Sequence, residues 1–206
     1  MSKGCLITLE GIEGCGKSTQ ARLLAWRLRE AGHRVLLTAE PGGTRLGKTA
    51  RAALLDPKRR IEPLAEWFLF EADRAQHVGE VINPALRRGM VVICDRFSDS
   101  TRAYQGFGRG FGLEAVESVD RLATGGLKPR LTFVLDLPVS EGLKRARKRG
   151  KLSRIEREQL KFHEKIRAAF LVLATREPDR IKVVDGRLGR AAAAEAVYRH
   201  AARVLG

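Results

Sequence analysis

Gly11-Ile12-Glu13-Gly14-Cys15-Gly16-Lys17-Ser18 fits the phosphate-binding loop pattern, in which glycines, a lysine and a hydroxyl stand at fixed offsets. Residues 5–9 before it form an apolar run that predicts a short buried strand, and residues 19–30 after it repeat leucine and tryptophan at helical spacing. The motif requires this order of strand, loop and helix. The sequence therefore predicts a nucleoside triphosphate site. The alternative is a glycine-rich turn whose lysine is merely solvated.

Each residue type in the loop has a physical task. Glycines let the backbone wrap around phosphates, so that amide hydrogens and the helix N-terminus face the anion. Lys17 would reach the β- and γ-phosphates, and the Ser18 hydroxyl would ligate magnesium. We expect the bound nucleotide to contact the whole stretch, namely Gly11, Ile12, Glu13, Gly14, Cys15, Gly16, Lys17, Ser18 and Thr19.

The rest of the chain alternates apolar segments with stretches of helical periodicity. Such alternation predicts one α/β domain over residues 1–206, a parallel five-stranded sheet surrounded by helices in a P-loop NTPase fold. No linker of proline, glycine or serine divides it. Polar motifs follow two of the expected strands, where ligands of such folds bind. Besides residues 5–9, the expected strands are 35–38, 90–94, 131–136 and 181–184.

The charge balance is strongly basic, with 39 lysines and arginines against 24 aspartates and glutamates. It concentrates in residues 144–151 and, to a lesser degree, in 58–60. Polyphosphate substrates and nucleic acids both attract basic residues, so the charge does not separate a nucleotide enzyme from a nucleic-acid binder. We find no recognisable DNA- or RNA-binding motif and expect no nucleic-acid partner.

Cys5, Cys15 and Cys94 have no metal-ligand spacing, and we expect buried thiols in a reduced cytosol. No targeting segment precedes the first strand, and no apolar run reaches membrane-spanning length, so we expect a cytoplasmic protein without a membrane partner. The four histidines, His33, His77, His163 and His200, have no mutual spacing for a metal or a triad, and we expect surface positions for all of them.

Five motifs together resemble the bacterial thymidylate kinase family over nearly the whole chain. The resemblance implies a nucleoside monophosphate kinase-like fold, a homodimer, and transfer of the γ-phosphoryl group from ATP to dTMP with Mg²⁺, a step of dTTP biosynthesis. The motifs are Gly-Ile-Glu-Gly-Cys-Gly-Lys-Ser at 11–18, Glu-Pro-Gly-Gly-Thr at 40–44, Asp-Arg-Phe at 95–97, Ala-Tyr-Gln-Gly at 103–106 and Arg-Ile-Glu at 154–156.

The resemblance implies which residues hold the acceptor. Phe70 would stack on thymine, and Arg74, one helical turn away, would bond the edge of the base. Tyr104 would lie near the sugar and disfavour a 2′-hydroxyl. Glu13 would face that sugar or a magnesium-bound water. The remaining expected acceptor residues are Arg51 and Arg96 at the phosphate, Thr101 at the base, and Ser100 and Gln105 beside them.

The basic run resembles a lid over ATP, which we place at about residues 144–156. Family members carry their catalytic arginine either in the phosphate loop or in the lid. Since this loop has none, the lid type is implied, with Arg149 as the first candidate and Arg147 behind it. Arg145 would bracket the donor phosphates together with Arg149. Asp95 would hold magnesium with Ser18, and Lys17, Arg96, Arg149, Asp95 and Glu13 form the expected catalytic set.

Three positions depart from the family pattern: Cys15 in the loop, Phe97 after Asp-Arg, and Ser153 before Arg154. The first puts a thiol beside the phosphates, the second removes a side-chain hydrogen bond, and the third could alter how the lid is latched. Two alternatives remain open at this point. One is a kinase of another nucleoside monophosphate, and the other is a nucleic-acid-binding P-loop ATPase.

Overall fold

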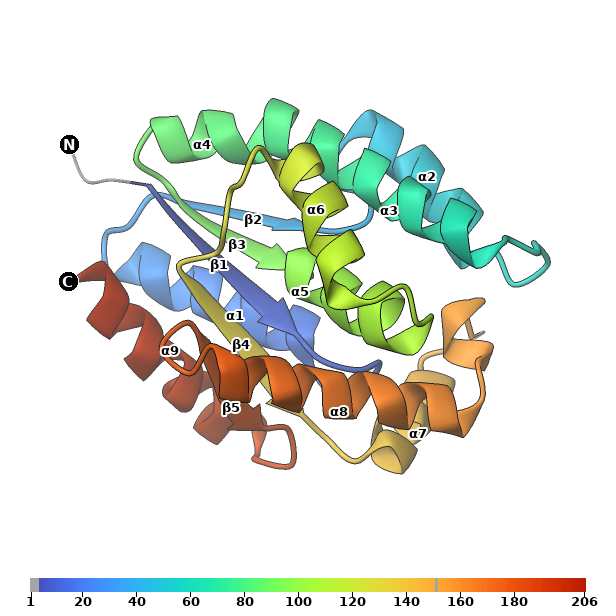
Figure 1. The fold of residues 1–206 in the computed structure, drawn as a ribbon. Coiled ribbons are helices and arrows are strands. Elements are labelled where there is room, and N and C mark those ends of the chain that lie inside the picture. The colour runs from blue at the N-terminus through green and yellow to red at the C-terminus, as the bar shows by residue number, and fades with distance from the viewer. Residues whose placement is uncertain (1–3, 151) are drawn as a thin grey trace.

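The computed structural model describes residues 4–150 and 152–206. Lys151, which belongs to the expected lid and basic run, lies outside the described residues. A single parallel sheet has the strand order β2-β3-β1-β4-β5 (Figure 1), which confirms the expected five strands. They are β1 (Cys5–Glu10), β2 (Val35–Ala39), β3 (Val91–Asp95), β4 (Leu131–Asp136) and β5 (Ile181–Asp185).

Helices cover both faces of this sheet (Figure 1). α1 packs against α9, α3 packs against α2 and α6, and α7 packs against α8. The helices are α1 (Lys17–Glu30), α2 (Arg45–Leu55), α3 (Pro63–His77), α4 (Asn83–Arg87), α5 (Ser98–Thr101), α6 (Leu113–Thr124), α7 (Val139–Lys148), α8 (Leu160–Arg176) and α9 (Arg190–Leu205).

Three short helical segments of other types join them. The π-helical segments η1 (Val78–Ile82) and η2 (Arg102–Gly108) continue α3 and α5, and the 3₁₀ turn η3 (Ile155–Arg157) precedes α8. Gly106 and Gly108 thus lie in helical structure. A Cβ at Gly108 would lie 2.6 Å from Ile166 Cδ1, so close packing of η2 on α8 accounts for that glycine.

Strand side chains alternate between two cores. Leu6, Val92 and Cys94 face Ile82 and Phe97, whereas Ile7 and its neighbours pack in the larger cluster. All six residues of β1 are buried, as expected for the central strand of a sheet that helices cover on both faces. The three cysteines are free and buried, as expected.

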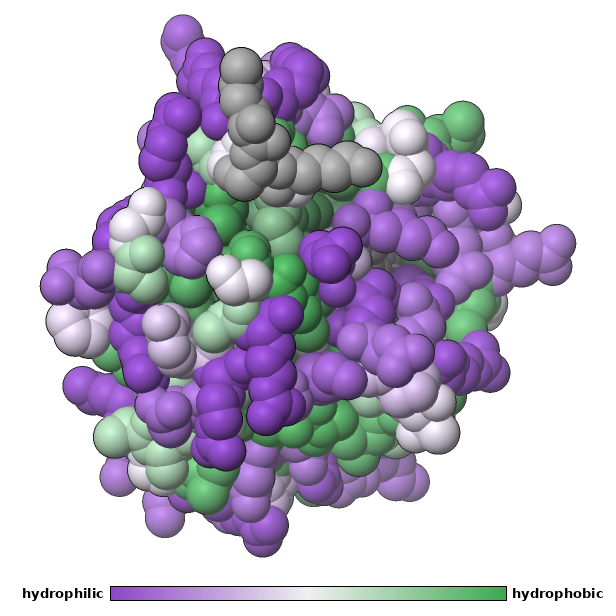
Figure 2. Space-filling model, turned by 90° about the vertical axis from the view of Figure 1, so that its left-hand side faces the viewer, coloured by the Kyte–Doolittle hydropathy of each residue, from purple (hydrophilic) through white to green (hydrophobic). Residues whose placement is uncertain are grey.

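The register of the strands brings their carboxyl ends to one edge. Leu9 of β1 and Ala39 of β2 both lie opposite Asp95 of β3. The opposite end of the sheet, beside both chain termini, is covered mostly by hydrophilic side chains (Figure 2). Among the described residues, no helix has both the length and the apolar character needed to cross a bilayer.

Candidate active site

A cavity of about 990 Å³ lies at the carboxyl ends of β1, β2 and β3. Residues from the phosphate loop, α3, η2 and the segment after α7 meet there, as the sequence predicted for a ligand site at this edge. The predicted site residues that line it are Glu13, Gly14, Lys17, Ser18, Arg51, Phe70, Arg74, Asp95, Arg96, Ser100, Thr101, Tyr104, Gln105 and Arg149.

The phosphate loop requires glycine at two close approaches. Gly14 has φ 73°, and a Cβ there would lie 2.1 Å from the Gly142 carbonyl oxygen of α7. Gly11 has φ 133°, and a Cβ would lie 2.6 Å from the Leu135 carbonyl oxygen. Side chains other than hydrogen are therefore excluded by both backbone conformation and space.

Lys17 is buried in the loop that contains it. Its Nζ donates to the carbonyl oxygens of Gly11, at 3.0 Å, and Ile12, at 2.7 Å, and lies 3.5 Å from Cys15 Sγ. Cys15 therefore packs inside the loop with an exposed fraction of 3%. The backbone oxygens of the loop therefore hold the Lys17 ammonium group.

Ser18 and Asp95 meet at the floor of the cavity. The Ser18 hydroxyl donates to Asp95 Oδ2, which joins the start of α1 to the end of β3. Hydroxyl and carboxylate oxygens are ligands that Mg²⁺ accepts. The donor set of this pair fits the expected magnesium site.

Arg96 follows β3 in a left-handed backbone conformation, with φ 73°. Such a conformation is costly for a residue with a Cβ, by about 1–3 kcal/mol, and persists where surrounding contacts impose it. Here the Arg96 amide donates to Leu9 O at 3.0 Å, and Nη1 donates to Gly11 O at 3.1 Å and Ser100 Oγ at 3.0 Å. The turn thus directs the guanidinium toward the phosphate loop.

Glu13 is the acidic partner of that guanidinium. Its Oε1 accepts from Arg96 Nη2 at 3.2 Å and from the Tyr104 hydroxyl at 2.5 Å, while Oε2 lies 3.3 Å from His163 Nδ1. Burial by itself would raise the pKa of Glu13, but His163, Arg96, Lys17 and Tyr104 outweigh it and hold the pKa below its usual range. Glu13 is therefore a fixed anion at the boundary between the loop and η2.

Glu10 is a site residue that the sequence analysis did not identify. It is fully buried, accepts from the Phe97 amide at 2.8 Å and from the Ser100 hydroxyl at 2.5 Å, and so braces the Arg96 turn. Burial raises its pKa to about 7, with a contribution from Asp99. The available signal was an acidic residue at the carboxyl end of an apolar strand that enters the phosphate loop.

Arg74 is held by acidic groups from several elements. Its Nε donates to Glu40 Oε2 at 3.0 Å, and Nη1 donates to Glu71 at 2.9 Å, Thr101 Oγ1 at 2.8 Å and Asp120 at 3.2 Å. Nη2 has no acceptor among the described residues, and Arg74 lines the cavity. Phe70, one turn earlier on α3, lines it too. The pair shares one helical face, as predicted.

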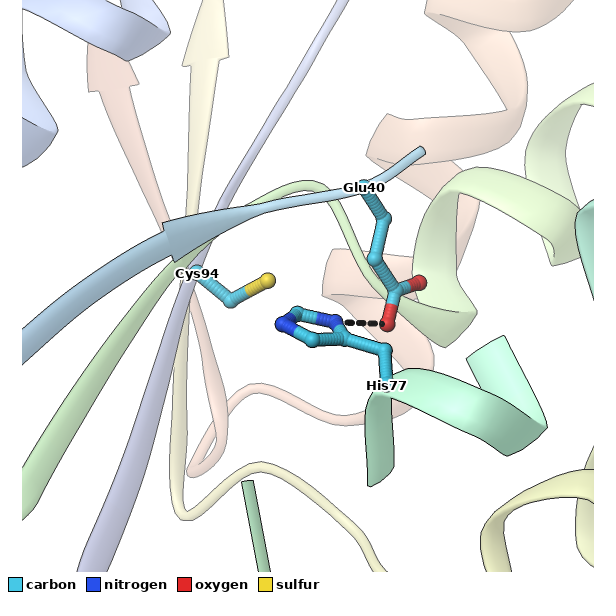
Figure 3. Close-up of side chains that lie close together, drawn as sticks. All are labelled: Glu40, His77 and Cys94. Carbon is cyan, nitrogen blue, oxygen red and sulfur yellow. Dashed lines mark hydrogen bonds and ion pairs between the residues drawn. The ribbon is translucent and has the colours of Figure 1, made fainter. Parts of the chain in front are cut away.

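Glu40, His77 and Cys94 form a buried cluster behind this arginine (Figure 3). His77 is completely buried, so the expectation of a surface position is wrong. Its Nδ1 lies 2.9 Å from Glu40, its Nε2 lies 2.7 Å from Thr38 Oγ1, and a Cβ at Gly43 would lie 2.3 Å from Nε2. Both ring nitrogens are thus occupied. The cluster is a structural brace, as its packed surroundings and the guanidinium on Glu40 disfavour a bound cation.

His163 is also completely buried, which corrects the second of the expected surface histidines. It lies on α8 and contacts Glu13 across the site. Both histidines belong to long helices, α3 and α8. The side that each one occupies depends on tertiary packing, which motif spacing does not encode.

The segment after α7 brings Arg149 to the cavity but not Arg145. Arg149 Nη2 lies 3.2 Å from Glu156 Oε1, whereas Arg145 Nη1 donates to Gly186 O at 3.3 Å. Ser153 and Glu156 cap each other: the Ser153 amide donates to Glu156 Oε2 at 2.8 Å, and Ser153 Oγ accepts from the Glu156 amide at 3.4 Å. The serine that departs from the family pattern therefore completes a capping box.

Arg154 fastens the same segment to α3. It donates to Glu66 Oε2 at 2.6 Å and to Leu54 O at 3.0 Å, and Glu66 also binds Arg109 and Gln105. Burial by itself would raise the pKa of Glu66, but the two arginines outweigh it and lower that pKa. One carboxylate thus joins three segments that surround the cavity.

Arg51, on α2, is exposed and donates to Pro41 O at 2.9 Å, at the rim of the cavity. Phe97 is fully buried, and its ring centroid lies 5.4 Å from Arg74 Cζ. This arrangement is a cation–π contact between Arg74 and Phe97.

Comparison with known proteins gives a consistent result. A family model described as thymidylate kinase matches residues 9–196. A thymidylate kinase of Deinococcus radiodurans is 52% identical over 185 residues, which cover 90% of each chain. One of Geobacter sulfurreducens is 51% identical over 201 residues, with 94% of each chain covered. A crystal structure of thymidylate kinase from Ehrlichia chaffeensis aligns with a TM-score of 0.76 at 32% identity, and it covers 98% of this chain and 99% of that one.

Proposed function

The chain belongs to the thymidylate kinase family, and from this membership we infer that it transfers the γ-phosphoryl group of ATP to dTMP, giving dTDP and ADP. One observation supports the inference most directly. A single cavity is lined both by the phosphate-loop residues Lys17 and Ser18 and by Phe70, Arg74 and Tyr104. Donor and acceptor would therefore meet in one space, which is the main requirement of phosphoryl transfer.

We assign the donor half to the phosphate loop. Lys17 would leave its carbonyl partners for the β- and γ-phosphates, while the loop amides bind the same groups. Magnesium, for which Ser18 and Asp95 provide the oxygen ligands, would neutralise charge on the phosphates. Arg149 would add positive charge beside the transferring group from the lid. Arg145 faces Gly186 instead, so we propose only a supporting role for it.

We assign the acceptor half to η2, α3 and the Arg96 turn. Phe70 would stack on thymine, and the free Nη2 of Arg74 would bond the edge of the base together with Thr101 and Gln105. Arg96 and Arg51 would hold the acceptor phosphate, with Ser100 steadying Arg96. The Tyr104 ring and the Glu13 carboxylate would border the sugar, where a 2′-hydroxyl lacks room and partners.

The test measures ADP formation from ATP and magnesium across dTMP, dUMP, dCMP, UMP and AMP. We expect strong preference for dTMP and a loss of about 100-fold or more in kcat for Arg149→Ala. Arg147→Ala is the matched control, because this neighbour in the basic run does not line the cavity. Preference for another acceptor would overturn the thymine assignment. ADP formation without any acceptor dependence would favour an ATPase.

We also propose a homodimer formed through α3 and α6, which pack side by side (Figure 1). Phe68 on α3 and Leu122 on α6 are 51% and 85% exposed, which is costly for large apolar side chains that stay in water. We expect sedimentation equilibrium to show a dimer for the parent and a monomer for a Phe68→Ser, Leu122→Ser double variant. A monomeric parent would contradict the assignment.

Free, buried cysteines are consistent with a reducing compartment, and we place the enzyme in the cytoplasm. The basic residues around the cavity are largely paired with carboxylates. Arg74, Arg96 and Arg154 each contact at least one buried acidic group. This pairing favours recognition of phosphates inside the cavity over an open nucleic-acid surface.

A further inference from the structure

His163 is the fourth residue of α8 and lies beside Glu13 of the phosphate loop. Its side chain is 1% exposed, and Nδ1 lies 3.3 Å from Glu13 Oε2. Glu13 Oε2 and both ring nitrogens of His163 have no hydrogen-bond partner among the described residues. Buried polar atoms of this kind are costly when they lack a partner. His163 Nδ1 and Glu13 Oε2 are therefore the polar atoms best placed to interact with each other.

The opposite oxygen of Glu13 is already committed. Oε1 accepts from Arg96 and from the Tyr104 hydroxyl, so these two groups fix one end of the carboxylate. With Oε1 alone held, the Glu13 carboxylate can still rotate about its Cγ–Cδ bond, and a contact at Oε2 restricts this rotation. His163 is the described polar side chain that faces Oε2, and a proton on Nδ1 makes the contact attractive.

The surroundings of His163 hold it in place. Phe162 and Phe170, on the same helix, meet the Tyr104 ring edge-on, with centroid distances of 6.2 and 6.3 Å. Close packing of Gly108 against Ile166 keeps η2 near α8. One face of α8 therefore contacts the Tyr104 ring and the Glu13 carboxylate together, and it begins just after the lid segment.

We propose that His163 is a positioning residue that holds Glu13 against Arg96 and Tyr104, and thereby sets the shape of the acceptor side of the cavity. The inference rests on the proposed place of Glu13 beside the acceptor sugar. His163 reaches no reacting group and acts through Glu13 alone. The expected consequence is a loss of affinity for dTMP, with little change in affinity for ATP.

Three variants test this inference. His163→Phe fills the space without a donor, His163→Gln carries its amide one bond too far from Glu13, and His163→Asn keeps a donor near the place of Nδ1. We expect the first two to raise KM for dTMP about tenfold, because the Glu13 carboxylate then loses its polar contact at Oε2, and Asn to restore most of the affinity. KM for ATP should change less than about threefold. His200→Phe on α9, the same exchange far from the site, is the control.

A double-mutant cycle with Glu13→Gln separates positioning from general packing. In the Glu13→Gln background, His163→Phe should change KM for dTMP by less than about twofold. An equal effect in both backgrounds, or a lowered melting temperature with unchanged KM, would overturn the inference. If Glu13→Gln alone left KM for dTMP unchanged, the assignment of Glu13 would fall and the inference with it. If Glu13→Gln raised KM and the His163 variants did not, only the inference would fall.

Discussion

Gly142 offers the sharpest test of how the lid helix is joined to the phosphate loop. It lies inside α7, where a Cβ would be 2.5 Å from the Glu13 carbonyl oxygen and 3.0 Å from Ile12 Cδ1. Alanine is favoured over glycine within a helix by about 1 kcal/mol. The Cβ, however, would lie about 0.9 Å closer to a backbone atom than ordinary van der Waals contact allows, and overpacking of this kind costs about 1–3 kcal/mol. We expect Gly142→Ala to be destabilised by no more than about 2 kcal/mol.

The effect on catalysis should be much larger than the effect on stability. To admit the methyl group, α7 and the loop must separate by most of an ångström, and a displacement near 1 Å of a positioning group costs about 100-fold in rate. We expect kcat/KM for ATP to fall by about this factor, measured by a coupled ADP assay. Calorimetry on the same preparations gives the melting temperature.

Gly79→Ala is the matched control for this exchange. Gly79 lies in the π-helical segment after α3, and a Cβ there meets no atom within 4 Å. We expect it to raise the melting temperature slightly and leave the kinetics unchanged. If Gly142→Ala were as stable and as active as Gly79→Ala, the contact between α7 and the loop would be soft. The reasoning from close packing would then be refuted.

Three further predictions follow from buried charge and buried sulfur. Folding raises the pKa of Glu10, and a protein that contains such an acid becomes less stable as pH rises. The free energy of unfolding of the parent, measured by urea titration relative to Glu10→Gln, should therefore fall by about 3 kcal/mol between pH 4 and pH 8. A difference that stays constant with pH would contradict the buried carboxyl. Glu66→Gln leaves two arginines without their buried carboxylate and should cost about 3–5 kcal/mol in thermal or urea unfolding, whereas Glu195→Gln, in an exposed pair, should cost less than about 1. Equal effects of these two variants would count against the buried network. A thiol reagent should inactivate the enzyme slowly through Cys15, which is buried beside Lys17, and ATP should protect it; a mass spectrum showing full labelling of Cys15 at full activity would exclude that contact from function.

The sequence predicted those parts of the molecule that depend on local pattern. Glycine positions, apolar runs and the polar residues after each strand are short-range signals, and they were sufficient for the five-stranded sheet and the phosphate loop, whereas the family resemblance indicated residues such as Phe70 and Tyr104 that also line the cavity. The acidic partners were harder to predict. Glu66 meets Arg154 across 88 positions and Glu10 meets Ser100 across 90, and no periodicity reports such pairings.

The histidines show the same limit of local sequence patterns. His77 and His163 carry no spacing that separates a buried brace from a solvated side chain, because burial depends on what packs against the helix. Arg145 and Arg149 illustrate a related case. They are one helical turn apart in sequence, but α7 ends at Lys148, so the two side chains diverge and face Gly186 and Glu156 respectively.

The glycine contact between α7 and the phosphate loop also divides the chain into parts that can be exchanged independently. α7 meets the loop at Gly142, and α8 begins at Leu160. Between these two points the segment is fastened by Arg154, Glu156 and Glu158 and by the buried side chain of Ile155. A lid grafted from a relative between those points would need to keep these fastening side chains and Arg149, so chimeras could alter donor choice while retaining the proposed thymine pocket.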